Sequence, residues 1–381
     1  MKTQLRTASI ALAVAALFSS SAVLAQTVVR IGHVAPMTGG IAHLGKDNEN
    51  GAKLAIADLN KAGLTIGGQK VKFELLSEDD AADPKQGTAA AQKLVDAKVA
   101  GVIGHLNSGT TIPASTLYNR AGIAQISPSS TNPRYTLQGY NTAFRVVAND
   151  GQLGGTLGRY AVNELKGKSI AIIDDRTSYG QGVADEFAKG VQAAGGKVIT
   201  RQYTTDKAAD FSAILTTIRG RKPDVVFFGG MDAVGGPMLR QMKQLGIDAK
   251  FMGGDGICTS ELPKLAGDAV GNAKVICAEA GGVVGKFEKK MADFRTRFKS
   301  ETGEEVKLYA PYVYDATMVM VEAMKKANST DPKAYLPELA KIKYEGVTGP
   351  IAFDKNGDIL NGTLTLYTFN GPKRELVKVI Q

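Results

Sequence analysis

The sequence predicts an α/β protein with two doubly wound lobes, each built on a parallel sheet. Short β-branched runs alternate with longer segments of helical period between residues 28 and 276, which is the pattern of repeated βαβ units. The alternation forms two series that meet near residue 148. A chain of 381 residues is also larger than most single-domain proteins and long enough for two domains, each with its own hydrophobic core.

The first series predicts the amino-terminal lobe. Asp83 and Pro84 support one helix start, because aspartate accepts from free N–H groups there and proline gives up a donor that the first turn cannot use. Residues 144–147 are predicted as a strand that crosses into a linker, which marks the first domain boundary. The predicted elements are strands at 28–34, 71–76, 99–103 and 122–126, and helices at 45–61 and 83–98.

The second series repeats this pattern, and the tail returns to both lobes. Its strands are predicted at 169–174, 198–203, 225–228, from Lys250 and at 273–276, with helices at 180–194, 211–220 and 235–245. The tail contributes helices at 287–301 and 312–326 and strands at 351–353, 364–369 and 377–380, too few strands to enclose a third core. Three crossings therefore form the hinge. We predict a signal peptide over 1–25, a first lobe over 26–148 plus 280–352, and a second lobe over 149–279 plus 353–381.

The amino terminus predicts export. Lys2 and Arg6 precede an apolar segment at residues 10–18, and small residues lead to Ala25, as in a cleaved secretory signal peptide. This segment is shorter than the roughly 20 residues that span a bilayer. Because Gln26 rather than cysteine follows the cleavage point, we expect release into the periplasm without a lipid anchor or direct membrane insertion.

The two cysteines, Cys258 and Cys277, follow or end neighbouring predicted strands. They either pair or remain buried thiols, and an oxidising compartment favours the disulfide. Spacing in the sequence does not decide between the two, because a disulfide depends on the separation of the Cα atoms.

Charge and motif content disfavour several classes of function. The formal net charge is +9, but the 46 basic residues are scattered among 37 acidic ones, so no nucleic-acid surface is predicted. The histidines His33, His43 and His105 form no metal-binding pair, and phosphate-loop and nucleophile-elbow motifs are absent. Residues 354–358 lack the ligands of a calcium loop and are predicted as a turn. We expect no enzyme, no cofactor and no metal.

Two hydroxyl-rich turns are the main candidate site. Residues 104–111 and 127–131 each follow a predicted apolar strand, so both turns are expected at the carboxyl ends of parallel strands, where open α/β sheets bind ligands. Neutral donors at helix amino termini bind an anion without a buried counter-charge. The turns are therefore predicted to hold a small anion.

Several short motifs together resemble the leucine/isoleucine/valine-binding proteins, which are type I periplasmic solute-binding proteins of ABC importers. The resemblance covers nearly the whole mature chain, and it implies the type I periplasmic-binding-protein fold and transport of a small amino acid to a membrane permease. The motifs that carry it are Pro36-Met37-Thr38-Gly39-Gly40 with Gly45 and Gly51, residues 80–85, Gly104-His105-Leu106, Ser127-Pro128, Tyr179-Gly180-Gln181-Gly182, residues 251–256, and Gly349-Pro350 with Phe353-Asp354.

The resemblance implies a set of ligand-binding residues. Ser108, Ser129 and Thr131 match the positions that hold the ligand's α-carboxylate, with Ser129 acting mainly through its backbone. Asp255 and Tyr179 match the positions that hold the ammonium. Each of these residues can instead have a purely structural role. The hydroxyls can cap the helices that follow them, Asp255 can accept hydrogen bonds from the backbone of its turn, and Tyr179 can pack in the core.

The pocket wall departs from the branched-chain pattern. Leu44 and Met231 stand where tyrosines can occur, and Ala82 and Asn107 replace a disulfide of some family members. Leu44 and Met231 are predicted as an adaptable apolar wall, or else as ordinary core, and His43 as a residue of the pocket mouth rather than a contact. The preference of the pocket for one amino-acid side chain over another therefore stays open. There are two alternative functions. The protein binds another small carboxylate or amide, such as an aromatic acid, or it is a ligand receptor that feeds a sensory partner.

Overall fold

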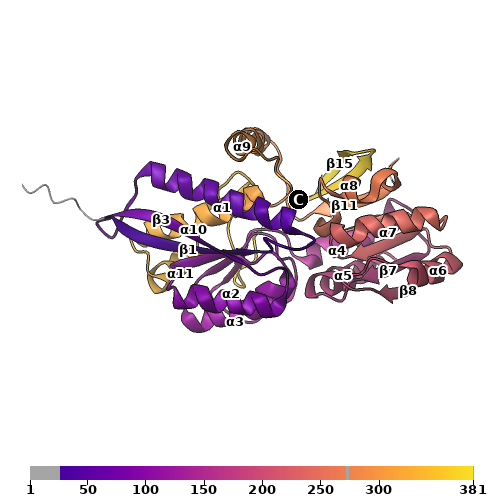
Figure 1. Ribbon diagram of the computed structural model, residues 1–381, viewed down its shortest axis with the longest axis horizontal. Helices are drawn as coiled ribbons and strands as arrows, with labels where there is room; N and C mark the ends of the chain where they lie inside the picture. Colours follow the sequence, from indigo (N-terminus) through magenta and orange to yellow (C-terminus); the bar gives the residue numbers. More distant parts are fainter. Residues whose placement is uncertain (1–25, 272–273, 381) are drawn as a thin grey trace, which may run out of the picture.

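The computed structural model describes residues 26–271 and 274–380, so the predicted signal peptide lies outside the described residues. Two lobes are built on separate sheets and lie end to end (Figure 1). The first sheet has the strand order β2-β3-β1-β4-β5-β6, and the second has the order β15-β14-β11-β10-β9-β7-β8. Parallel pairs dominate both sheets, as the βαβ pattern predicts.

The first lobe is a doubly wound sheet. Helices α1 and α10 cover one face, and α2 packs against β1 and β3 from the other face beside α3. The elements are β1 (Thr27–Ala35), α1 (Ala42–Ala62), β2 (Thr65–Ile66), β3 (Gln69–Asp79), α2 (Pro84–Asp96), β4 (Gly101–Gly104), α3 (Ser108–Ala121), β5 (Gln125–Ser127), the short helix η1 (Pro133–Tyr135) and β6 (Ala143–Arg145).

The second lobe repeats the design and ends in an antiparallel pair. Helices α4 and α5 pack together against one face of its sheet, and α7 packs against α6 and α8. The elements are α4 (Asp150–Asn163), β7 (Ile170–Asp174), α5 (Ser178–Ala193), β8 (Val198–Tyr203), α6 (Ser212–Arg221), β9 (Val225–Gly229), α7 (Asp232–Gln244), β10 (Lys250–Gly253), η2 (Asp255–Ile257), α8 (Leu262–Ala266), η3 (Gly267–Val270), β11 (Val275–Glu279), β14 (Leu364–Asn370) and β15 (Lys373–Ile380).

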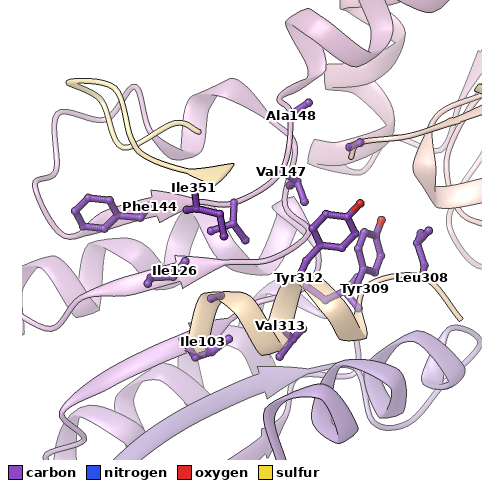
Figure 2. Close-up of a cluster of buried hydrophobic side chains, with 14 of the residues drawn as sticks. Ile103, Ile126, Phe144, Val147, Ala148, Leu308, Tyr309, Tyr312, Val313 and Ile351 are labelled. Atoms are coloured by element: carbon purple, nitrogen blue, oxygen red, sulfur yellow. The ribbon is translucent and has the colours of Figure 1, made fainter. Parts of the chain in front are cut away.

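The tail visits both lobes in turn. After α9 (Lys286–Thr302), α10 (Ala310–Lys326) and α11 (Pro332–Ala340), a small hairpin of β12 (Tyr344–Glu345) and β13 (Pro350–Ile351) precedes the return to the second sheet. Figure 2 shows Tyr312 and Val313 of α10 in one buried cluster with Ile103 and Ile126 of the first sheet, with the Tyr312 ring on the side of Val147. Helix α1 approaches α10 closely at Gly51, where a Cβ would lie 2.4 Å from the carbonyl oxygen of Ala310.

Most predicted elements are present, with shifted ends. Helix α7 begins at Asp232 instead of residue 235, so Met231 becomes its N-cap residue. The predicted strand at 351–353 is wrong in extent, because β13 ends at Ile351 and Phe353 forms only an isolated bridge with Ile359. The turn at 354–358 is confirmed: the carboxylate of Asp354 accepts from the N–H groups of Asn356 and Asp358. No helix in the described ranges is long and apolar enough to cross a membrane.

The structure joins Cys258 and Cys277 in a disulfide, with Cα atoms 5.3 Å apart, which is the pairing that the sequence left open. The bond ties the segment after β10 to the neighbouring strand β11.

Replacing both cysteines with serine is expected to lower the free energy of unfolding by about 3 kcal/mol, because a cross-link across 19 positions restricts the unfolded chain. Urea denaturation followed by circular dichroism measures the loss. The wild-type protein treated with a reductant serves as the control and should show a similar loss. An unchanged unfolding free energy in the double variant contradicts the prediction.

Candidate ligand-binding cleft

A cavity of about 440 Å³ lies between the two lobes. Ile41 and Asn107 line it from the first lobe, and Tyr179, Lys207 and Met231 line it from the second. The first turns of α3, α5 and α7 all reach this cavity or its edge, since their N-cap residues Asn107, Thr177 and Met231 are lining residues. Helix amino termini carry unpaired N–H groups and favour an anionic ligand.

The two hydroxyl turns lie side by side at the carboxyl ends of β4 and β5. The hydroxyl of Ser108 accepts from the Ser130 hydroxyl at 3.1 Å and from the Asn132 N–H at 3.2 Å, which leaves its own proton available for donation. The hydroxyl of Ser129 donates to the carbonyl of Leu106 at 3.0 Å, so only its backbone remains for a ligand. The parallel register of β4 and β5 brings these turns together.

Thr131 and Asp150 form a buried polar pair beside these turns. The Thr131 hydroxyl and both carboxylate oxygens of Asp150 are fully buried and lack a partner within hydrogen-bond geometry. Burial raises the pKa of Asp150 to about 8, and the nearby Thr131 hydroxyl opposes this shift only in part. Thr131 and Asp150 lie close enough to interact with each other, but their remaining hydrogen-bonding capacity is buried and unused, so they are candidates for contact with a solute.

Asp255 is held by two tyrosines. Its carboxylate accepts from the Tyr179 hydroxyl and from the Tyr309 hydroxyl, each at 2.7 Å, and its side chain is fully buried. Burial raises the pKa of Asp255 to about 6, although the two tyrosine hydroxyls lower it. A carboxylate accepts about four hydrogen bonds, so these two contacts leave room for further donors.

A distant carboxylate positions Tyr309. Asp47 on α1 accepts from four consecutive backbone N–H groups, those of residues 307–310, at 2.8 to 3.1 Å. These groups belong to the segment that leads into α10 and to the first residue of that helix, Ala310, whose N–H has no intrahelical partner. Neither Asp47 nor Tyr309 was among the predicted site residues.

The seven predicted ligand-binding residues occupy three different environments. Tyr179 and Met231 line the cavity, and the Tyr179 hydroxyl connects the cavity wall to Asp255. Ser108 lies between the lining residues Asn107 and Gly109 but is itself buried, as are Ser129, Thr131 and Asp255. Leu44 is fully buried within the hydrophobic core and is not among the lining residues. Their roles toward a ligand stay predictions.

The two acidic side chains at this site lack an ion-pair partner in the described residues, although the charge of Arg145 lowers the pKa of Asp150 in part. Neither Asp150 nor Asp255 forms an ion pair with a lysine, arginine or histidine in the described part of the chain. The negative charge of Asp255 contributes to the raised pKa of Asp150, so the two carboxyl groups influence each other. The same part of the chain holds no cluster of three or more metal-ligating side chains.

Comparisons with known proteins agree with this architecture. A family model described as "Periplasmic binding protein" matches residues 28–373. A Leu/Ile/Val-binding protein homolog 1 of Brucella abortus (strain 2308) is 38% identical over 356 residues, which cover 92% of this chain and 91% of that protein.

Two solved structures have the same fold over most of their length. A leucine-binding protein of Thermotoga maritima superimposes with a TM-score of 0.83 at 26% identity, covering 92% of this chain and 98% of that one. A solute-binding protein of an ABC transporter from Rhodopseudomonas palustris BisB5, in complex with 3,4-dihydroxybenzoic acid, superimposes with a TM-score of 0.79 at 25% identity. The match covers 93% of this chain and 97% of that one.

Proposed function

The chain belongs to the periplasmic binding protein family, and on this premise we propose that it is the solute-binding component of an ABC amino-acid importer. The proposed ligand is a small L-amino acid, branched-chain or otherwise apolar, bound between the lobes. The 38% identical relative, named as a Leu/Ile/Val-binding protein homolog, supports an amino acid as the solute.

The buried carboxyl pair carries the proposal. Asp150 and Asp255 are both fully buried without an ion-pair partner in the described ranges, and burying such groups unpaired is unfavourable. The α-ammonium of an amino acid supplies the missing positive charge for Asp255, whereas Asp150, with its pKa raised to about 8, is mostly protonated at neutral pH and offers an O–H donor. Ser108, Thr131 and the amino terminus of α3 supply donors for its α-carboxylate, while Met231 and the neighbouring apolar residues of the cavity accommodate the side chain.

Binding is proposed to act through closure of the hinge. A ligand that contacts both lobes binds the closed arrangement more tightly than the open one and therefore shifts the population toward it. The closed protein then presents a surface from both lobes to a membrane permease. We propose that the mature protein works in the periplasm after removal of residues 1–25.

A thermal-shift screen tests the proposal. L-leucine, L-isoleucine and L-valine are expected to raise the melting temperature, because a ligand that binds only the folded state stabilises it. Benzoate and 3,4-dihydroxybenzoate represent the alternative function, which the Rhodopseudomonas palustris complex favours. A shift with these acids and none with amino acids would overturn the proposed ligand class.

The affinity for L-leucine is expected to fall as the pH decreases through 6. Burial raises the pKa of Asp255 to about 6, and only the ionised carboxylate pairs with an ammonium group. Between pH 8 and pH 5 the ionised fraction of Asp255 falls about tenfold, so the dissociation constant measured by calorimetry should rise by about tenfold in a D150N variant, in which Asp255 titrates without Asp150. Asp150, with a pKa raised to about 8, titrates in the same direction, and the D150N variant separates the two contributions. A flat profile in both proteins contradicts the assignment of Asp255.

A further inference from the structure

The side chains of His43 and Asp232 join the two lobes at the edge of the cavity, in addition to the contact of Tyr309 with Asp255. His43 lies on α1 in the first lobe, and Asp232 is the first residue of α7 in the second lobe. The His43 Nε2 atom lies 2.9 Å from the Asp232 carboxylate oxygen Oδ2. The His43 side chain is 20% exposed, whereas that of Asp232 is fully buried, so the contact is largely shielded from water.

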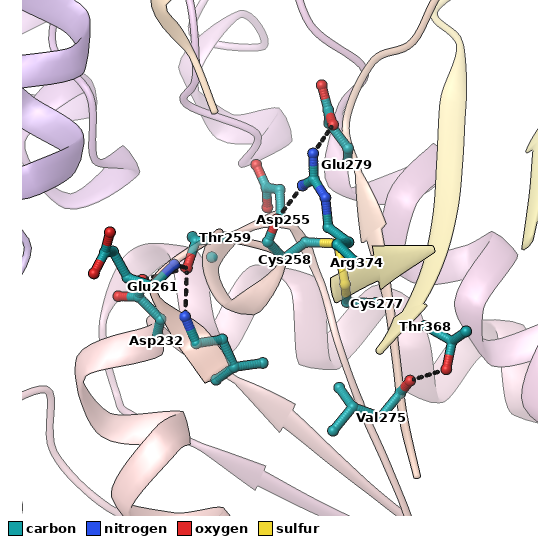
Figure 3. The surroundings of a disulfide bond; sticks show 12 residues. Asp232, Asp255, Cys258, Thr259, Glu261, Val275, Cys277, Glu279, Thr368 and Arg374 are labelled. Carbon is teal, nitrogen blue, oxygen red and sulfur yellow. Dashed lines mark hydrogen bonds and ion pairs between the residues drawn. A yellow bond between two sulfur atoms is a disulfide. The ribbon is translucent and has the colours of Figure 1, made fainter. Parts of the chain in front are cut away.

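The same oxygen of Asp232 has a second partner within its own lobe. The Thr259 hydroxyl donates to it at 2.5 Å and accepts from the N–H groups of Glu261 and Leu262, both at 3.2 Å. Thr259 follows Cys258, which the disulfide fixes to β11. Figure 3 shows Asp232, Thr259, Cys258 and Asp255 gathered around this short segment. The interlobe contact is therefore connected to the segment that carries Asp255.

The walls of the cavity meet closely around this contact. Residues on both sides of it line the cavity: Gly40 and Ile41 from the first lobe, Met231 and Ala233 from the second. A Cβ on Gly40 would lie 3.3 Å from the Cβ of Ala233, so the two lobes touch here. Opening of the hinge between the lobes would separate His43 from Asp232.

We propose that His43, Asp232 and Thr259 form an interlobe latch that stabilises the closed cleft and strengthens binding of every solute held there. The inference rests on the proposed function, because it requires a solute in the cleft. The three latch residues contact one another across the two lobes and do not contact the solute. The apparent dissociation constant of a protein that binds only when closed varies inversely with its closed fraction. A weaker latch therefore weakens binding by the same factor for every ligand.

Calorimetric titration with L-leucine and with L-valine tests this uniform effect. H43A is expected to raise both dissociation constants by about tenfold, which corresponds to the loss of one largely buried hydrogen bond to a charged group. H43Q keeps an N–H donor and should restore much of the affinity. K46A removes an exposed side chain one turn along α1 and should change neither constant. An unchanged affinity in H43A, or a loss for one ligand alone, overturns the latch while leaving the proposed function intact.

A second measurement needs no ligand. Nitroxide labels at Q92C on α2 and Q192C on α5, both exposed positions, report the distance between the lobes by double electron–electron resonance. The short-distance population of the ligand-free protein is expected to decrease in H43A and to stay unchanged in K46A. Identical distance distributions with and without the H43A substitution overturn the latch. Failure of all amino acids to bind, combined with a shifted distribution in H43A, overturns the proposed ligand class but supports the latch.

Discussion

The D255N variant is expected to bind L-leucine at least about thirtyfold more weakly than the wild-type protein, since truncation or neutralisation of a buried charged partner costs about 2–5 kcal/mol. Asparagine keeps the size of the side chain but removes the charge that pairs with the ligand's ammonium group. It also replaces one of the two oxygens that accept from Tyr179 and Tyr309. Isothermal titration calorimetry measures the loss directly.

Two controls make this result specific. D248N neutralises an exposed aspartate of the same lobe and should leave the affinity unchanged. The amine-free analogue 4-methylpentanoate should lose no affinity in D255N, because it offers no ammonium group to Asp255. Unchanged binding of L-leucine to a folded D255N protein removes Asp255 from the ligand site.

The D47A variant is expected to lose about 3 kcal/mol of unfolding free energy, because four backbone N–H groups, three of them in buried contacts, lose their shared acceptor. The first turn of α10 then loses its cap, and Tyr309 loses the backbone support that aims its hydroxyl at Asp255. We therefore expect a weaker affinity for L-leucine as well. Urea denaturation and calorimetry measure the two effects.

The control for this prediction lies on the same helix. K53A removes an exposed side chain of α1, whose contact with Glu49 is an i,i+4 surface pair, and should change the unfolding free energy by less than about 0.5 kcal/mol. Equal stabilities of D47A and the wild type would show that the four N–H groups find other acceptors. In that case Asp47 has no part in positioning Tyr309.

The hydroxyl turns could be predicted because their position follows from local rules. Each turn comes directly after an apolar strand, and parallel pairing of β4 with β5 brings the two strand ends to one edge. The same reasoning located the segment of Asp255 at the end of β10, and a resemblance to known proteins supplied the roles. The two-lobed α/β fold could be predicted for the same reason, since the period of the apolar residues is a local property.

The remaining features depend on contacts that no local pattern reveals. Asp47 and the residues it caps are about 260 positions apart, and Tyr309 reaches Asp255 across 54 positions. Asp150 occupies a predicted linker, where an aspartate is ordinary in the sequence and its burial depends on packing between the lobes. Leu44 was open between a place in the pocket wall and a place in the core, and the structure buries it in the hydrophobic core.

A crystal structure of the protein with bound L-leucine tests the central claim most directly. The account predicts the ammonium nitrogen within about 3.2 Å of the Asp255 carboxylate, which is hydrogen-bond distance, and the α-carboxylate at the hydroxyls of Ser108 and Thr131. A leucine bound elsewhere, or bound with its ammonium group away from Asp255, would contradict the account.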